Sequence, residues 1–358
     1  MQSDDGTIPA PEHVLSGTGT SGPASSSAGS TGSESIGTGS SGAVAAEAAA
    51  PESRPGVEAA RAALAGVVAI PVTPFTADGP VDWDQHGALL RRLVDGGIKA
   101  VTPNGNTGEF YTLDPAEARR AAENTVKFVG DRAAVIVGVG LDTKSASEAA
   151  RHAAEAGAGL IMVHQPVHPY ISGEGWTEYH RRIADAVPEL GVVLYVRDAR
   201  ITGAQIAQLG DQCPNVVGIK YSVTDPVRFA AVAREAGRAR FAWVDGLAEL
   251  YAPAYYAVGA TGFTSGLVNV APRIALEMHE RLSGGDYPGA MGIWELIRPF
   301  EELRAADSAA DNVSVVKEAL AQLGLARRDV RPPSRSLPRQ VRDQIEAILA
   351  SWGERWTM

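Results

Sequence analysis

A lysine ends a short apolar run in the second half of the sequence. The run is Val216–Lys220, and its composition predicts a buried strand that carries the amine of Lys220 to its tip. A lysine that is removed from water loses part of its preference for the charged form, and the neutral amine can attack a ketone to form a Schiff base. The alternative is a side chain that extends past the strand end into solvent, and position alone does not separate the two.

The first 57 residues differ in composition from the rest of the chain, which has 358 residues and a 45% hydrophobic fraction. They are rich in Gly, Ser, Ala, Thr and Pro, and they contain no aromatic residue. Such a segment cannot bury enough apolar surface to offset its ordering entropy, so we predict a disordered tail. Six of its seven charged residues are acidic, against a net charge of −10 for the whole chain. A solubilising role is the simplest interpretation, and binding of a partner is the alternative.

The sequence also argues against several classes of protein. An acidic chain without a basic cluster does not suit a nucleic-acid partner. No apolar run reaches the length needed to span a membrane, and the start lacks the pattern of a secretory signal. Cys213 is the only cysteine, which excludes an internal disulfide. We therefore expect a cytoplasmic protein.

From Val67 onward, short apolar runs alternate with amphipathic stretches of helical period. Eight strands with helices between them, within about 200 residues, predict a (β/α)8 TIM barrel. The alternative, an open doubly wound sheet, would need a Gly-rich phosphate loop after its first strand, where Pro71–Phe75 stands instead. The predicted strands are Val67–Ile70, Ile98–Val101, Ala134–Gly138, Gly159–Val163, Val192–Tyr195, Val216–Lys220, Phe241–Asp245 and Ala260–Ser265.

The predicted helices include several with clear start signals. Asp114 and Asp225 each precede a proline and suit the cap position of a helix. Beyond about Ala271 only helical patterns continue, so we expect a barrel over residues 58–270 and a C-terminal helical extension over residues 271–358. The segments expected to be helical are Trp83–Asp95, Pro115–Val129, Ser145–Ala156, Arg273–Ser283, Ala290–Ala305, Val313–Leu323 and Arg339–Ser351.

Polar residues at the other strand ends form the rest of the candidate site, because TIM-barrel active sites lie at the carboxyl ends of the strands. After the second strand, Gly105–Glu109 could present backbone N–H groups and hydroxyls to an anion, or be a structural turn. After the fourth strand come His164, His168 and Tyr170. We do not expect a metal there, because no carboxylate or third imidazole stands at a suitable spacing. Proton relay or ligand contact is the alternative function.

Tyr195 ends the fifth strand, next to the predicted strand of Lys220. Its phenol could shuttle protons during Schiff-base chemistry, or it could be a core aromatic. Arg200 or Arg197 could clamp a substrate carboxylate through two parallel hydrogen bonds, unless Asp198 pairs with them at the surface. The eighth strand ends at Thr264-Ser265-Gly266, where a ligand could approach the backbone closely.

Taken in order, these segments resemble the dihydrodipicolinate synthase/N-acetylneuraminate lyase family, from about Gly66 to Ser351. The resemblance implies a class I aldolase-type barrel, usually a homotetramer, that uses no metal or organic cofactor. It implies that Lys220 forms a Schiff base with pyruvate or another 2-keto acid, that Tyr195 donates and accepts the proton, and that Asn106 and Thr107 hold the carboxylate. The segments that carry the resemblance are Gly105–Glu109, Leu194–Tyr195 with Arg200, Gly218–Lys220, Gly262–Asn269 and Val330–Pro333.

The chain departs from the synthases of that family at two places. They carry Thr-Thr where this chain has Asn106-Thr107, and Pro-Tyr-Tyr where it has Pro166-Val167-His168. We therefore expect the relay phenol to be lost or replaced by the imidazole of His168, which could instead shape the distal pocket. Gly108–Phe110 and Tyr195–Asp198 look closer to the branch that dehydrates 5-keto-4-deoxyglucarate.

Three functions follow as hypotheses. The first is a lyase that acts on a sugar-derived 2-keto acid, by retro-aldol cleavage or dehydration, in a homo-oligomer of two or four subunits. The second is dihydrodipicolinate synthase itself, and the third is a keto-acid-binding protein without turnover. For the lyase, Lys220 and Tyr195 are the expected catalytic residues. The expected substrate-binding residues are Asn106, Thr107, Arg200, His168, Thr264 and Ser265.

Overall fold

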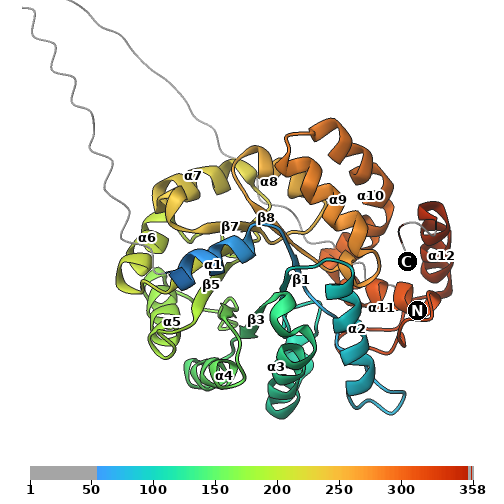
Figure 1. Ribbon diagram of the computed structural model, residues 1–358, viewed down its shortest axis with the longest axis horizontal. Coiled ribbons are helices and arrows are strands. Elements are labelled where there is room, and N and C mark those ends of the chain that lie inside the picture. The colour runs from blue at the N-terminus through green and yellow to red at the C-terminus, as the bar shows by residue number, and fades with distance from the viewer. Residues whose placement is uncertain (1–54, 354–355, 357–358) are drawn as a thin grey trace, which may run out of the picture. The chain divides into compact units, whose positions relative to one another are not determined.

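The computed structural model describes residues 55–353 and residue 356 of the chain. Eight parallel strands pair in chain order and close into a barrel, with β8 hydrogen-bonded back to β1 (Figure 1). The predicted (β/α)8 TIM barrel is therefore confirmed. The strands are β1 (Val67–Ala69), β2 (Ala100–Val101), β3 (Ala134–Val139), β4 (Leu160–Val163), β5 (Gly191–Val196), β6 (Val216–Tyr221), β7 (Ala242–Asp245) and β8 (Gly262–Ser265).

Helices surround the barrel on the outside, as Figure 1 shows. Asp114 caps α3 through its carboxylate, which accepts hydrogen bonds from the first turn, and Asp225 caps α7 in the same way. Both predicted helix starts are confirmed. The outer helices are α2 (Trp83–Asp95), α3 (Pro115–Val129), α4 (Thr143–Glu155), α5 (Gly173–Asp185), α6 (Gly203–Gln212), α7 (Pro226–Ala236) and α8 (Ala252–Ala257).

Both faces of the strands are buried, which explains why the apolar runs show no polar alternation. Side chains on the outer face join the core beneath the helices. Side chains on the inner face form a second cluster that fills the barrel. Its strand members are Val68, Ala100, Ile136, Leu160, Met162, Val193, Tyr195, Val217, Ala242 and Val244.

A short helix, α1 (Pro55–Leu64), precedes the barrel and was not predicted from the sequence. It starts inside the segment expected to be disordered, whose residues 1–54 lie outside the described residues. Ala60 and Leu64 belong to the cluster inside the barrel, and α1 contacts β5, β6 and β7. Leu64 is 1% exposed. The helix therefore closes the end of the barrel at which the strands begin.

Helix α9 (Pro272–Ser283) follows β8 and packs against β1 and α8, so it is the eighth helix around the barrel. The C-terminal helices α10 (Tyr287–Ala309), α11 (Asn312–Gln322) and α12 (Arg339–Trp352) come after it (Figure 1). The backbone of α10 leaves helical geometry at Ala306, Asp307 and Ser308, close to the predicted helix end at Ala305. Among the described residues, no helix has the length and apolar character required to cross a bilayer.

Candidate active site

Lys220 and Tyr195 lie side by side inside the barrel. The strands β5 and β6 pair in a register that sets Tyr195 opposite Lys220. The Nζ atom of Lys220 lies 4.3 Å from the centroid of the Tyr195 ring. Both side chains are 5% exposed, so the amine does not extend into bulk solvent. The strand ladder thus brings an amine and a phenol together in a water-poor space.

The surroundings of Lys220 favour its neutral form. Burial is the main cause that lowers the pKa of the amine below its ordinary value, and nearby Arg197 adds to this effect, whereas Tyr195 and Asp245 oppose it. Gly246 leaves room for the lysine, because a Cβ at this position would lie 2.9 Å from Lys220 Cγ. The site therefore holds a lysine that is easier to deprotonate than one in water.

The turn after β2 reaches the phenol of Tyr195. The Asn106 side-chain amide donates a hydrogen bond of 3.2 Å to Tyr195 Oη. Thr107, the next residue of the turn, is 8% exposed. A hydrogen-bond donor at the phenol oxygen stabilises negative charge there, as a proton-transferring tyrosine requires. Asn106, Tyr195 and Lys220 thus form a connected group at the carboxyl ends of three strands.

His164 supports this group from the neighbouring strand β4. Its Nε2 donates to the Asn104 carbonyl over 2.8 Å, and its ring stacks on Phe110 at a centroid distance of 4.5 Å. The ring also lies 5.9 Å from that of Tyr195. Burial lowers the pKa of His164 to about 4, so the imidazole is neutral at physiological pH.

Three predicted substrate contacts are placed away from this group. The Arg200 side chain is 70% exposed and binds Asp198 through Nε and Nη2. His168 is exposed, and its Nδ1 accepts a 3.1 Å hydrogen bond from the backbone N–H of Tyr170. Ser265 is buried, and its hydroxyl bonds Glu249. The structure therefore contains the surface ion pair between Arg200 and Asp198 that was the alternative to a substrate contact.

Thr264 lies on the inner face of the barrel, since its neighbour Ser265 points outward to Glu249 and side chains alternate along a strand. It is 5% exposed, and its hydroxyl donates to the Asp245 carbonyl over 3.4 Å. Thr264 therefore faces the same interior as Lys220.

One further residue at this end of the barrel, Tyr111, was not singled out in the sequence, whereas Arg197 was considered there as an alternative to Arg200. Tyr111 follows the turn after β2, and its ring lies 5.5 Å from that of His164. Burial and nearby Tyr195 raise the pKa of the Tyr111 phenol, while Arg197 lowers it. Arg197 thus acts electrostatically on both Tyr111 and Lys220. The aromatic pair Phe110-Tyr111, directly after a Gly-rich turn, was the available sequence signal.

No group of three or more His, Cys, Asp or Glu side chains that could hold a metal ion occurs in the described part of the chain.

A family model of the dihydrodipicolinate synthetase family matches residues 63–352. The chain belongs to this family. Curated relatives include a probable 5-dehydro-4-deoxyglucarate dehydratase of Saccharopolyspora erythraea, 32% identical over 78% of this chain and 91% of its own length. A protein of Rhizobium rhizogenes with the same name is 31% identical over 77% of this chain and 92% of its own length.

Solved structures of the family resemble the fold closely. Dihydrodipicolinate synthase from Bacillus clausii is 38% identical and has a TM-score of 0.79, over 82% of this chain and 99% of that one. The enzyme from Oceanobacillus iheyensis is 36% identical with a TM-score of 0.80, over 83% and 99%. The E. coli protein YagE, solved in complex with pyruvate, is 26% identical with a TM-score of 0.73, over 80% and 97%. The chain is a class I aldolase-type lyase.

Proposed function

We propose that this protein forms a Schiff base between Lys220 and the ketone of a sugar-derived 2-keto acid, and then removes water or splits a carbon–carbon bond. The observation that carries the proposal is the buried amine of Lys220, 4.3 Å from the ring centroid of Tyr195. The relatives named as dehydratases of 5-dehydro-4-deoxyglucarate point to substrates of that kind.

In the proposed mechanism the neutral amine of Lys220 attacks the ketone carbon, and the carbinolamine loses water to give a protonated imine. The imine then accepts an electron pair from the neighbouring carbon. In dehydration that carbon loses a proton and the next carbon loses hydroxide. In retro-aldol cleavage the bond between the two carbons breaks instead. Tyr195 moves the proton, with Asn106 holding its oxygen, and hydrolysis of the imine frees Lys220.

The carboxylate of the keto acid belongs, in this proposal, at the turn that contains Asn106 and Thr107. The turn lies beside Tyr195, and Arg197 adds positive charge near the amine. Thr264 lies on the inner face near the same end of the barrel. Arg200 is bound to Asp198 and His168 to the backbone of Tyr170, so each would have to leave that partner in order to bind substrate.

Reduction with borohydride in the presence of pyruvate tests the first step. We expect a stable adduct, located on Lys220 by mass spectrometry of peptides, and no adduct on a folded Lys220→Met variant. A folded wild-type protein that gives no adduct would contradict the proposal. Incubation with 5-dehydro-4-deoxyglucarate then separates the two outcomes, since dehydration releases water from the skeleton and cleavage releases a shorter keto acid.

A second candidate function, dihydrodipicolinate synthase, is favoured by the 38% identity to the enzyme of Bacillus clausii. It requires condensation of pyruvate with aspartate semialdehyde. Product formation from that pair, with no turnover of the sugar acid, would replace the first proposal. An adduct without turnover of either substrate would identify a keto-acid-binding protein.

We also propose that the protein is a cytoplasmic homo-oligomer. Exposed apolar side chains gather on loops that follow β2, β3 and β4: Tyr111, Leu141, Val167 and Tyr170, of which Tyr170 is 86% exposed. Apolar groups of this kind mark interaction surfaces. Light scattering on the wild type and on Tyr170→Asp tests the assembly, with dissociation of the variant as the expected result and a monomeric wild type as the contrary one.

A further inference from the structure

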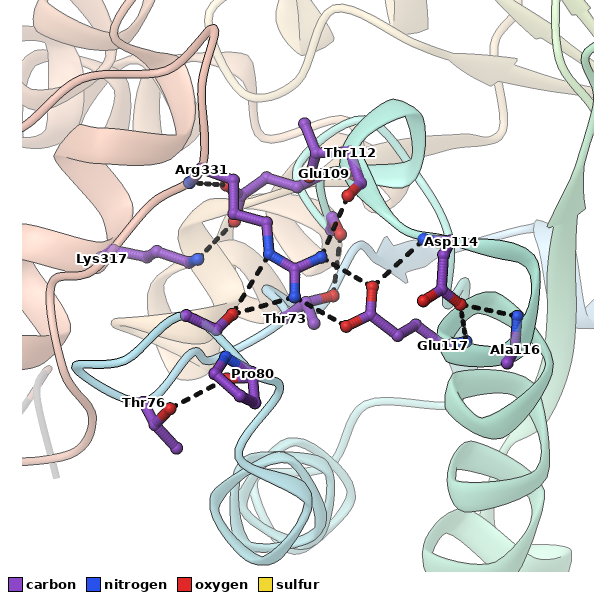
Figure 2. Close-up of polar contacts among 12 residues, drawn as sticks. Thr73, Thr76, Pro80, Glu109, Thr112, Asp114, Ala116, Glu117, Lys317 and Arg331 are labelled. Atoms are coloured by element: carbon purple, nitrogen blue, oxygen red, sulfur yellow. Dashed lines mark hydrogen bonds and ion pairs between the residues drawn. The ribbon is translucent and has the colours of Figure 1, made fainter.

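Glu109 is the last residue of the turn that bears Asn106 and Thr107, and its backbone is unusual. With φ 59° and ψ 35° it adopts the left-handed conformation that residues other than glycine rarely take. Its carboxylate is buried with 2% exposure and forms an ion pair with Lys317 of α11. The backbone N–H of Arg331 donates a second hydrogen bond, of 3.2 Å, to the same carboxylate (Figure 2). Two distant C-terminal residues therefore hold the last residue of the turn.

Lys317 is held in place by several buried contacts. Its side chain is 1% exposed, and its Nζ also donates to the Asp329 carbonyl over 2.9 Å. The same Nζ lies 4.0 Å from the centroid of the Phe75 ring. Removing one member of a buried ion pair is strongly destabilising, because the other charge is left without a partner. The pair between Glu109 and Lys317 is therefore a strong constraint on where Glu109 can lie.

Arg331 ties three further segments to the same place. Its guanidinium binds both carboxylate oxygens of Glu117 in α3 at 2.6 Å. It also donates to the carbonyl of Gly79 in the loop after β1, and to that of Thr112 just beyond the turn. Figure 2 shows this guanidinium at the centre of the group, with Glu117 and Thr112 around it. A planar guanidinium with several fixed partners restricts all of them.

A residue of α10 lies close to the loop after β8 and to Thr107. Arg304 forms a buried ion pair with Glu301 at 2.6 Å, and both side chains are 4% exposed. A Cβ placed at Gly266 would lie 2.3 Å from Arg304 Nη2 and 3.3 Å from Thr107 Cγ2. The Arg304 guanidinium is therefore packed where the loop after β8 meets Thr107.

We propose that the segment from α11 to Arg331 is a positioning part of the substrate site, in which Lys317 and Arg331 hold Glu109 and thereby orient Asn106 and Thr107 toward the substrate carboxylate. This inference rests on the proposed function. We call Lys317 and Arg331, with their contacts to Glu109, the clamp. A carboxylate is common to pyruvate and to every larger 2-keto acid, so the clamp affects the binding of all of them. Lys220 itself keeps its place on β6, so the capacity to form the imine at saturation is retained when the clamp is lost.

The experiment compares three variants with the wild type. Lys317→Met removes the buried ammonium group that pairs with the Glu109 carboxylate. Glu109→Gln combined with Lys317→Met removes both charges and leaves neither unpaired. Arg335→Met is the matched control, because Arg335 lies in the same region, is 63% exposed and pairs with Asp311 at the surface.

Three quantities are measured on each protein: the pyruvate concentration that gives half-maximal borohydride adduct, the urea-unfolding free energy, and hydrogen exchange in the peptide that spans residues 104–112. For Lys317→Met we expect the half-maximal concentration to rise about tenfold or more, with full adduct at saturation. The double variant should regain stability but keep the raised concentration and the faster exchange. Arg335→Met should match the wild type.

If the double variant regains both stability and the wild-type pyruvate dependence, the ion pair only supports the fold and the proposal fails. Unchanged exchange at residues 104–112 in both clamp variants overturns it equally. A wild-type protein without adduct overturns the proposed function instead, and the exchange measurement then judges the clamp by itself.

Discussion

Replacement of Glu249 by glutamine should change how the stability of the protein depends on pH. Glu249 is completely buried behind β8, where its carboxyl group bonds the Ser265 hydroxyl. Burial, and then the nearby Glu301 carboxylate, raise the pKa of Glu249 to about 8, while Arg304 opposes this shift. In the unfolded chain the same group has a pKa of about 4.3. Between these two values the folded state binds more protons than the unfolded state.

Because the folded state holds the extra proton, the free energy of unfolding falls as pH rises through this interval. Each pKa unit is worth about 1.4 kcal/mol, so the loss between about pH 5 and about pH 9 is on the order of 4 kcal/mol. Glu249→Gln keeps the size and the polar contact but removes the titration. Over the same pH range, the free energy of unfolding of this variant should therefore fall by about 4 kcal/mol less than that of the wild type.

Urea unfolding followed by circular dichroism at several pH values provides the measurement. Glu280→Gln, on an exposed position of α9, is the control with the same change in charge. It should follow the wild-type curve. Parallel pH curves for wild type and Glu249→Gln would refute the reasoning, since they would mean that Glu249 binds its proton equally in both states.

Three further predictions concern the barrel itself. The rate of adduct formation with pyruvate should rise with pH through a midpoint below the ordinary lysine pKa of 10.5, because burial lowers the pKa of Lys220 and only the neutral amine attacks. Quenched-flow trapping measures this rate, and a midpoint at 10.5 would contradict the prediction. Tyr195→Phe should lower turnover by about 10²–10⁴-fold while the fold is kept, and near-normal turnover would exclude the phenol as proton carrier. Leu64→Ala should destabilise the protein by about 2–5 kcal/mol in urea unfolding, because Leu64 fills the closed end of the barrel; a negligible change would mean that α1 is dispensable.

The sequence predicted the barrel well because its strands are buried on both faces and its helices carry strong start signals. All eight predicted strands overlap the observed ones, and Trp83–Asp95 and Pro115–Val129 have the observed helix bounds. The helix α1 was missed because its alanine-rich sequence resembles the tail before it. Its stability comes from inserting Leu64 into the barrel, which no local pattern reveals.

The candidate site was predictable only in part. Strand order placed Tyr195 beside Lys220, since neighbouring parallel strands deliver their ends to one edge. Side-chain direction beyond the strand ends was not predictable, because it depends on local partners. Asp198 binds Arg200, and Glu249 binds Ser265. The contact between Glu109 and Lys317 joins residues more than 200 positions apart, a separation over which sequence spacing carries no signal.

The pairing of Tyr195 with Lys220 across two adjacent strands separates the covalent step from the loop after β4. Their spacing is set by the backbone ladder, which can change only if a whole strand slips and every inward side chain turns outward. The loop after β4, which is exposed at residues 167–170, carries no such constraint. Exchanging the loop at residues 165–172 for that of a relative should therefore leave the covalent step on Lys220 intact.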